Sequence, residues 1–205
     1  MRRKVAIKNI IIFSLIFLVG IWLLLTLSSK QGESATVKNL SVPKFSKIDV
    51  DTSNADIEIK KGDSYKVIYN GKENTIPDIK VKRDTLQITS PHHSFIMGNI
   101  WDLFNRRRRV PLITIIVPTS NIGDISINSS NGNVTAKNVV IRQGEIDTSN
   151  GSVNISHSDA EGYDLSTSNG VVTFKGKKKG EEYSKKSNTN SVVEIDTSNG
   201  NINVN

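Results

Sequence analysis

The motif Ser-Asn-Gly recurs four times in the second half of the chain, and each copy leads into a run of alternating polar and apolar residues. The copies read SSNGNVTA, TSNGSVNI, TSNGVVTF and TSNGNINV, with asparagines at Asn131, Asn150, Asn169 and Asn199. The first two spacings between these asparagines are 19 residues and the last is 30. Repetition at a fixed period is typical of folds in which each unit buries its apolar face only against its neighbours.

Each copy predicts two strands joined by a turn. Thr, Val and Ile alternate with polar residues on both sides of Asn-Gly, a pattern that favours strand, turn and strand. We attribute the turn to the positive φ angles that asparagine and glycine adopt readily. A chain of hairpins would satisfy this pattern, but the constant 19-residue period favours a β-solenoid or β-helix-like domain in which each period is one rung.

In a solenoid, equivalent residues of neighbouring rungs stack about 4.8 Å apart. Two sets of apolar residues are expected to line the interior: Val134, Val153, Val172 and Ile202, and Ile127, Ile146, Leu165 and Ile195. The turn residues are expected to form a structural ladder at one corner: Asn131, Gly132, Asn150, Gly151, Asn169, Gly170, Asn199 and Gly200. Side-chain amides can hydrogen-bond along such a ladder, and a ligand-binding row is its alternative role.

Related β structure is expected from residue 45 onward. DTSNADIEI at 51–59 is an earlier copy of the repeat, with Ala55 in place of glycine. Period-two alternation predicts strands at 46–51, 55–60, 64–69, 78–82, 85–89 and 112–117. Two segments interrupt this all-β domain: an insertion at about 90–110 and a Lys-rich loop at about 175–191. The last strand, 201–204, has no cap in the sequence, which predicts weak self-association through an open end.

The N-terminal segment predicts a membrane anchor. Residues 10–27 are uncharged and almost wholly apolar, and as a helix they would reach about 27 Å, close to the thickness of a bilayer core. Four basic residues precede them, so the N-terminus is expected in the cytoplasm. We therefore divide the chain into a basic tail with a transmembrane signal-anchor at 1–29, a polar stalk at 30–44 and an extracytoplasmic domain at 45–205. A cleaved signal peptide is the alternative.

The formal net charge of +7 does not indicate nucleic-acid binding, because it is localised. Four basic residues lie in the first nine positions and four more form the run Arg106–Arg109, which leaves a nearly neutral body. No stripe of basic residues interleaved with aromatics follows a strand, as an RNA-binding sheet requires. The chain also has no cysteine, which excludes disulfides, thiol nucleophiles and cysteine-zinc sites.

Residues 95–109 are a candidate docking site for a membrane or a partner. Apolar residues at helical spacing precede four arginines, a combination suited to a membrane interface with anionic lipid. The candidate residues are Phe95, Ile96, Ile100, Trp101, Phe104, Arg106, Arg107, Arg108 and Arg109. The alternative is a short helix that caps one end of the repeat stack.

No pattern in the sequence predicts catalysis, a cofactor or a metal site. The three histidines fall in no metal-binding or nucleophile motif, and phosphate-binding glycine loops are absent from the sequence. Asp147 and Asp196 recur with the repeat, as outward-facing strand positions would. The sequence therefore favours a protein that is not an enzyme.

The repeats resemble a known family. TSNG units that follow the strand Ile115-Ile116-Val117-Pro118 and the segment Gly123-Asp124-Ile125 are similar to the bacterial "putative adhesin" family, a β-strand-repeat domain of unknown function in Gram-positive envelopes. The resemblance covers about residues 45–205. It implies a β-solenoid fold and, for some members, association with envelope-stress systems, and it supplies no catalytic residues.

These observations predict a non-enzymatic, membrane-anchored cell-envelope protein that displays a β-repeat domain for binding, adhesion or envelope-stress sensing. Expected partners are the membrane itself and an anionic lipid, an envelope protein or a glycan, with weak formation of homo-oligomers and no nucleic acid. Two alternatives remain open. One is a β-helix enzyme that acts on polysaccharide, and the other is a self-assembling envelope scaffold.

Overall fold

The computed structural model describes residue 19 and residues 36–90, 110–157 and 159–205. The chain divides into two compact units, Met1–Ser34 and Ala35–Asn205. All strands and all core residues that the structure describes lie in the second unit, which thus contains what it needs to fold alone.

Two predicted features lie outside the described residues: the anchor at 10–27, apart from residue 19, and the docking segment at 95–109. Among the residues that are described, no helix is long and apolar enough to cross a membrane. Both features therefore remain predictions from the sequence.

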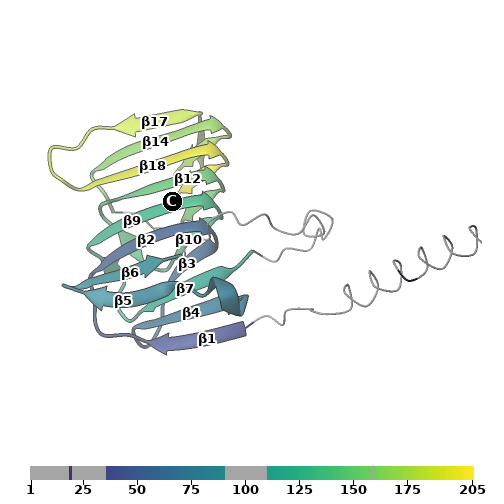
Figure 1. Cartoon of the computed structure of the whole chain (residues 1–205). Helices are drawn as coiled ribbons and strands as arrows, with labels where there is room; N and C mark the ends of the chain where they lie inside the picture. The colour runs from purple at the N-terminus through teal and green to yellow at the C-terminus, as the bar shows by residue number, and fades with distance from the viewer. Residues whose placement is uncertain (1–18, 20–35, 91–109, 158) are drawn as a thin grey trace, which may run out of the picture. The chain divides into compact units, whose positions relative to one another are not determined.

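The second unit consists of two large sheets and one small one (Figure 1). The eight-stranded sheet has the order β17 (Glu182–Lys185), β14 (Gly162–Asn169), β18 (Val192–Asn199), β12 (Gly144–Asn150), β9 (Asp124–Asn131), β2 (Lys47–Asn54), β6 (Thr85–Thr89) and β5 (Asp78–Lys82). The nine-stranded sheet has the order β1 (Thr36–Ser41), β4 (Lys66–Gly71), β7 (Leu112–Val117), β3 (Asp56–Lys61), β10 (Val134–Lys137), β13 (Val153–Ile155), β19 (Ile202–Val204), β15 (Val172–Phe174) and β16 (Lys177–Gly180). β8 (Asn121–Ile122) pairs with β11 (Val140–Ile141), and η1 (Glu73–Thr75) is a short 3-10 helix. The all-β prediction is confirmed.

Each Ser-Asn-Gly repeat contributes one strand to each large sheet, and equivalent strands pair in parallel and in register. Ile146 lies opposite Ile127 and Ile195, while Val153 lies opposite Val134 and Ile202. Both sets of apolar residues predicted to line the interior are buried, each at most 2% exposed. Burial of these stacked side chains is the main stabilising contribution to the fold.

The repeats do not stack in the order of the sequence. β18 and β19 of the last repeat lie between the second repeat (β12, β13) and the third (β14, β15). The prediction that the C-terminal strand leaves an open end is therefore wrong, because β19 has a parallel partner on each side. Figure 1 accordingly marks the C-terminus beside the middle strands.

The Lys-rich segment predicted as a loop contains strands. β16 pairs antiparallel with β15, and β17 pairs antiparallel with β14, so these two strands form one end of both sheets. Their charged side chains tolerate an edge position, where an unpaired backbone faces solvent.

The predicted stalk at 30–44 is wrong for residues 36–41, which form β1 and pair antiparallel with β4. This strand escaped prediction because its residues are mostly exposed and show no clear apolar alternation. The six strands predicted between residues 46 and 117 are all present, and each begins within two residues of the predicted position.

The turns between the sheets stack so closely that they leave no space for a side chain. A Cβ atom at Gly132, Gly151, Gly200 or Gly170 would overlap the carbonyl oxygen of Ala55, Gly132, Gly151 or Gly200, respectively. Our attribution of these turns to positive φ is therefore wrong for Gly151, Gly170 and Gly200, which do not adopt it. The glycines are required by the close approach of neighbouring backbones. Ala55 is the first residue in this column of stacked turns, so no earlier turn of the same kind lies against its methyl group.

We predict that Gly151→Ala lowers the free energy of unfolding by about 3 kcal/mol, because the methyl group must push two stacked backbones apart. The corresponding fall in melting temperature is roughly 10 °C for a unit of this size. Gly123→Ala is the matched control, since a methyl group there would lie 3.4 Å from the Ser46 carbonyl oxygen. Equal melting temperatures for the two variants would contradict the steric explanation.

Candidate functional site

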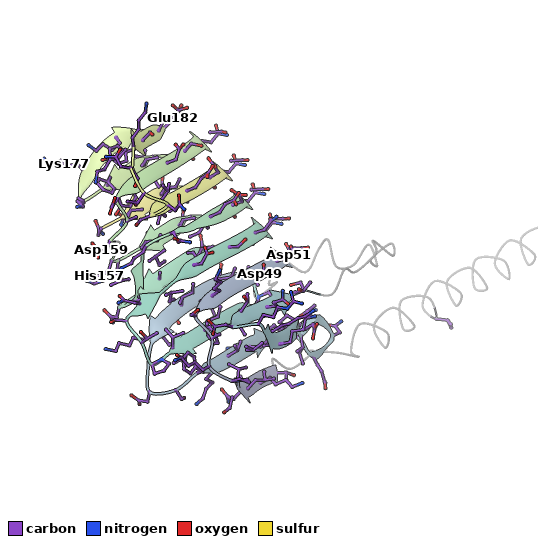
Figure 2. The ribbon with its side chains drawn as sticks, turned by 90° about the vertical axis from the view of Figure 1, so that its left-hand side faces the viewer. Asp49, Asp51, His157, Asp159, Lys177 and Glu182 are labelled. Carbon is purple, nitrogen blue, oxygen red and sulfur yellow. The ribbon has the colours of Figure 1, made fainter. Side chains whose placement is uncertain are left out.

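The outward face of the eight-stranded sheet carries rows of chemically similar side chains. Because neighbouring strands pair in register, equivalent residues of β2, β9, β12, β18 and β14 lie side by side. We call these rows the Asp–Ser face. They comprise Asp49, Ser126, Glu145, Glu194 and Asp164; Asp51, Asn128, Asp147, Asp196 and Ser166; and Ser53, Ser130, Ser149, Ser198 and Ser168. Figure 2 labels Asp49 and Asp51, which β2 contributes.

The middle of this face contains an open hollow of about 260 Å³. Its lining residues all have polar side chains: Asn128, Ser129, Asp147, Thr148, Ser149, Ser166, Ser168, Asp196, Thr197 and Ser198. Apolar surface dominates the pockets that bind drug-like molecules. A lining of hydroxyl, amide and carboxylate side chains, with no aromatic or large aliphatic residue, instead suits a ligand that forms many hydrogen bonds at the surface.

Like charges lie next to one another on the Asp–Ser face. Asp147 pairs with Asp196 and Glu145 pairs with Glu194 in the register of β12 and β18. Partial burial, followed by the charges of Glu145 and Asp196, raises the pKa of Asp147 above its ordinary value. The Asp196 carboxylate accepts a hydrogen bond from Ser166 Oγ, which holds it in place. Like charges directly opposite each other destabilise a sheet, and such departures from local optimality concentrate at functional sites.

The outward face of the nine-stranded sheet shows the opposite arrangement. Glu58 forms ion pairs with Lys137 Nζ at 2.8 Å and with Lys60 Nζ at 3.2 Å. The hydrogen bond from Lys137 is the main cause that lowers the pKa of the Glu58 carboxyl. Glu58 is thus compensated by two lysines, whereas Asp147, Asp196, Glu145 and Glu194 form no ion pair with another described residue.

The turn asparagines form a row in which each side-chain amide donates a hydrogen bond to the side-chain carbonyl of an adjacent asparagine. The Nδ2 atom donates to the next Oδ1 at 2.9 Å from Asn131 to Asn54, and at 3.0 Å from Asn150 to Asn131. The same bond joins Asn199 to Asn150 at 2.9 Å and Asn169 to Asn199 at 3.0 Å. These amides are committed to one another, which supports a structural role for the predicted row. The row follows the spatial order of the repeats and begins at Asn54, which the sequence analysis left out of it.

The other predicted sites have different outcomes. The docking residues between Phe95 and Arg109 lie outside the described residues. Within the part of the chain that is described, no group of three or more His, Asp or Glu side chains is arranged to hold a metal ion. The Asp–Ser face itself was missed, although the repeated Asp-Thr-Ser-Asn was a signal for it. The contact between Asp147 and Asp196 depends on the order of the repeats, which the sequence does not reveal.

We predict that the pKa of Asp147 lies above the ordinary value of aspartate and that Glu145→Gln lowers it only in part, because burial, the largest cause, remains. The folded state then binds a proton that the unfolded state has lost. Stability should therefore fall as pH rises from the ordinary aspartate pKa to the raised one, and Asp147→Asn should abolish this fall. NMR titration of the carboxyl carbons tests the prediction, and an Asp147 pKa at or below the ordinary value would contradict it.

The fold and its sequence place the chain among known proteins. Residues 45–178 match the family model described as Toastrack DUF4097. A solved structure described as a "putative cell adhesion protein" from Clostridium sporogenes is 17% identical, with a TM-score of 0.52, and the alignment covers 83% of this chain and 99% of the other. A solved structure described as a "putative adhesin" from Bacteroides fragilis is 12% identical, with a TM-score of 0.36, and the alignment covers 85% of this chain and 98% of the other. No curated protein matches the sequence. The family match spans most of the chain, which therefore belongs to the Toastrack DUF4097 family.

Proposed function

We propose that this protein is a non-enzymatic adhesion or binding module of the cell envelope, and that the Asp–Ser face contacts its ligand. The observation that carries the proposal is the set of adjacent carboxylates on one sheet face, which form no ion pair with another described residue and lie beside a row of serine hydroxyls. The protein from Clostridium sporogenes that shares the fold is described as a cell adhesion protein, which agrees with this role. We also propose that the unit is a β-solenoid whose last rung is inserted out of order.

The chemistry of the face favours a hydroxyl-rich glycan as the ligand. Neighbouring rows repeat hydrogen-bonding groups about every 4.8 Å along the stack, so a polymer can form the same contact several times. Serine hydroxyls both donate and accept hydrogen bonds, and carboxylates accept them. The face thus matches a chain of sugar hydroxyls, and the acids would in addition attract a sugar that carries an amine.

The paired aspartates also bear on the enzymatic alternative. A carboxyl with a raised pKa beside a second carboxylate is a pattern found in glycoside hydrolases. In those enzymes the two groups flank the bond that is broken. Asp147 and Asp196 instead project from neighbouring strands of one sheet face, beside an open hollow. This arrangement supports binding rather than hydrolysis.

We further propose that the segment 10–27 anchors the protein in the cell membrane as a single span, with a cytoplasmic N-terminus. The support is the uncharged apolar run and the basic residues that precede it. The β unit would then be displayed outside the membrane, where a glycan of the envelope is within reach. Sensing of envelope stress would use the same placement.

The ligand-binding role predicts selective crosslinking from the Asp–Ser face. A photoreactive residue at Ser149, which is exposed in the middle of the face, should yield sugar-containing adducts in cells that express the full chain. The same residue at Asn154, exposed on the other sheet, is the matched control. Mass spectrometry identifies the adducts. Equal yields from both positions, or none from Ser149, would contradict the proposal.

The membrane anchor predicts that an epitope tag fused after Asn205 is digested by protease added to intact cells. A tag fused before Met1 should be protected until the membrane is permeabilised. Immunoblotting of the two tagged proteins measures this directly. Protection of the C-terminal tag in intact cells would contradict the proposed topology.

A further inference from the structure

One end of the β unit is closed by an aromatic cluster. Phe174 of β15 stacks on Tyr183 of β17, with 4.5 Å between the ring centroids, and meets Tyr163 of β14 edge-on at 4.8 Å. Tyr163 and Phe174 are buried, while Tyr183 is half-buried. These rings fill the space between the last strands of the two sheets, where a further repeat would otherwise be required.

Lysines surround this aromatic cluster. The Nζ atoms of Lys179, Lys175 and Lys185 lie 4.9, 5.4 and 5.9 Å from the centroids of Tyr183, Phe174 and Tyr163. Three more lysines of the same segment are exposed: Lys177, Lys178 and Lys186. We call these six residues the lysine cap. Figure 2 labels Lys177 and Glu182, which both lie at this end of the stack.

The lysine cap carries an excess of positive charge. None of the ion pairs formed between described residues involves one of these six lysines. Glu181 and Glu182 are the acids within the segment, so positive charge remains in excess there. Cation–π contacts steady the lysine stems without neutralising the ammonium groups, which keep their donors free for an anion.

We propose that the lysine cap binds a linear polyanion that carries phosphate groups along its length. Lysine is a flexible point charge, which suits a mobile chain of phosphates better than one fixed anion. The adjoining Asp–Ser face repels a polyanion, so the electrostatic field of the unit directs such a chain to this end. The lysine cap includes β16, one edge strand of the nine-stranded sheet. The other edge strand is β1, the first strand of the unit (Figure 1).

The residues of the cap favour a polymer over a lipid surface. Membrane-surface binding of a protein generally combines basic residues with exposed apolar side chains that enter the headgroup region. β16 is exposed along its length and consists of lysines and a glycine, and the aromatic rings beneath are largely covered. The lysine cap thus presents positive charge without exposed apolar side chains that could enter a membrane. This binding site is separate from the Asp–Ser face, so either proposal can fail without the other.

The test measures binding of long-chain inorganic polyphosphate to the unit 35–205 by calorimetry at low ionic strength. The cap variant combines Lys177→Gln, Lys178→Gln and Lys186→Gln, which leaves the three lysines over the aromatic rings in place. The control combines Lys38→Gln, Lys44→Gln and Lys61→Gln, which removes the same total charge from exposed lysines in or beside β1 and β3, away from the cap strands β16 and β17. Melting temperatures of both variants should equal that of the unchanged protein.

We expect the cap variant to bind polyphosphate at least tenfold more weakly, and the control to bind it within about twofold of the unchanged protein. The plot of log affinity against log salt concentration has a negative slope, and its magnitude should decrease by about 2 in the cap variant, which has a weaker salt dependence. A third variant, with arginine at the three cap positions, should retain the affinity. The face variant Asp147→Asn should not weaken polyphosphate binding, which separates this result from a failure of the glycan proposal.

Several results would overturn the proposal. Equal losses in the cap variant and in the control would show a dependence on net charge alone. Absence of binding by the unchanged protein would remove the polyanion site. Tighter binding to phosphatidylglycerol vesicles than to polyphosphate would assign the cap to a membrane. Salt-sensitive dimers that disappear in the cap variant, seen by ultracentrifugation without polyphosphate, would instead assign it to the acidic face of a second copy.

Discussion

The close approach of stacked turn backbones is the constraint on which the rest of the structure depends. At each Asn-Gly turn, the carbonyl oxygen of one repeat occupies the place that a Cβ atom of the next would need. The Gly151 N–H donates to the Asn199 carbonyl, and the Gly200 N–H donates to the Asn169 carbonyl. Glycine at these positions therefore fixes both the distance and the register between repeats. Ala55 is tolerated because it begins the column.

A fixed register has consequences on both faces of each sheet. Inside, it stacks valine, isoleucine and leucine side chains of neighbouring repeats on one another, which gives a continuous apolar core. At the corner, it brings each asparagine amide within hydrogen-bonding distance of the next. Outside, the same register sets Asp147 against Asp196 and Glu145 against Glu194. The chemically uniform rows that we assign to ligand binding thus follow from the same geometry that stabilises the fold.

Much of this architecture could be predicted from local sequence patterns. Period-two alternation located the strands between residues 46 and 117 and the buried positions of the repeats, because the direction of a side chain in a strand depends only on its neighbours in sequence. The order of the repeats could not be predicted. Repeats with the same motif can replace one another in a stack, so sequence similarity does not tell which two are adjacent. The longer spacing before Asn199 indicated an insertion but not its path. β1 was missed because its side chains carry little apolar signal.

The central claim is that the last repeat lies between the second and the third. The pairing of Asp147 with Asp196 and the position of the lysine cap at one end both depend on this order, so a measurement of which repeats are adjacent tests the claim most directly. The chain has no cysteine, so any disulfide that forms in a variant joins the two cysteines that were introduced. Adjacent in-register strands hold Cα atoms within the range of a disulfide, whereas strands separated by another lie about 10 Å apart. The account predicts that Ser149→Cys with Ser198→Cys forms a disulfide rapidly on mild oxidation and that Ser149→Cys with Ser168→Cys does not. Rapid crosslinking of the second pair in preference to the first, measured by mass spectrometry, would show repeats stacked in sequence order and would contradict it.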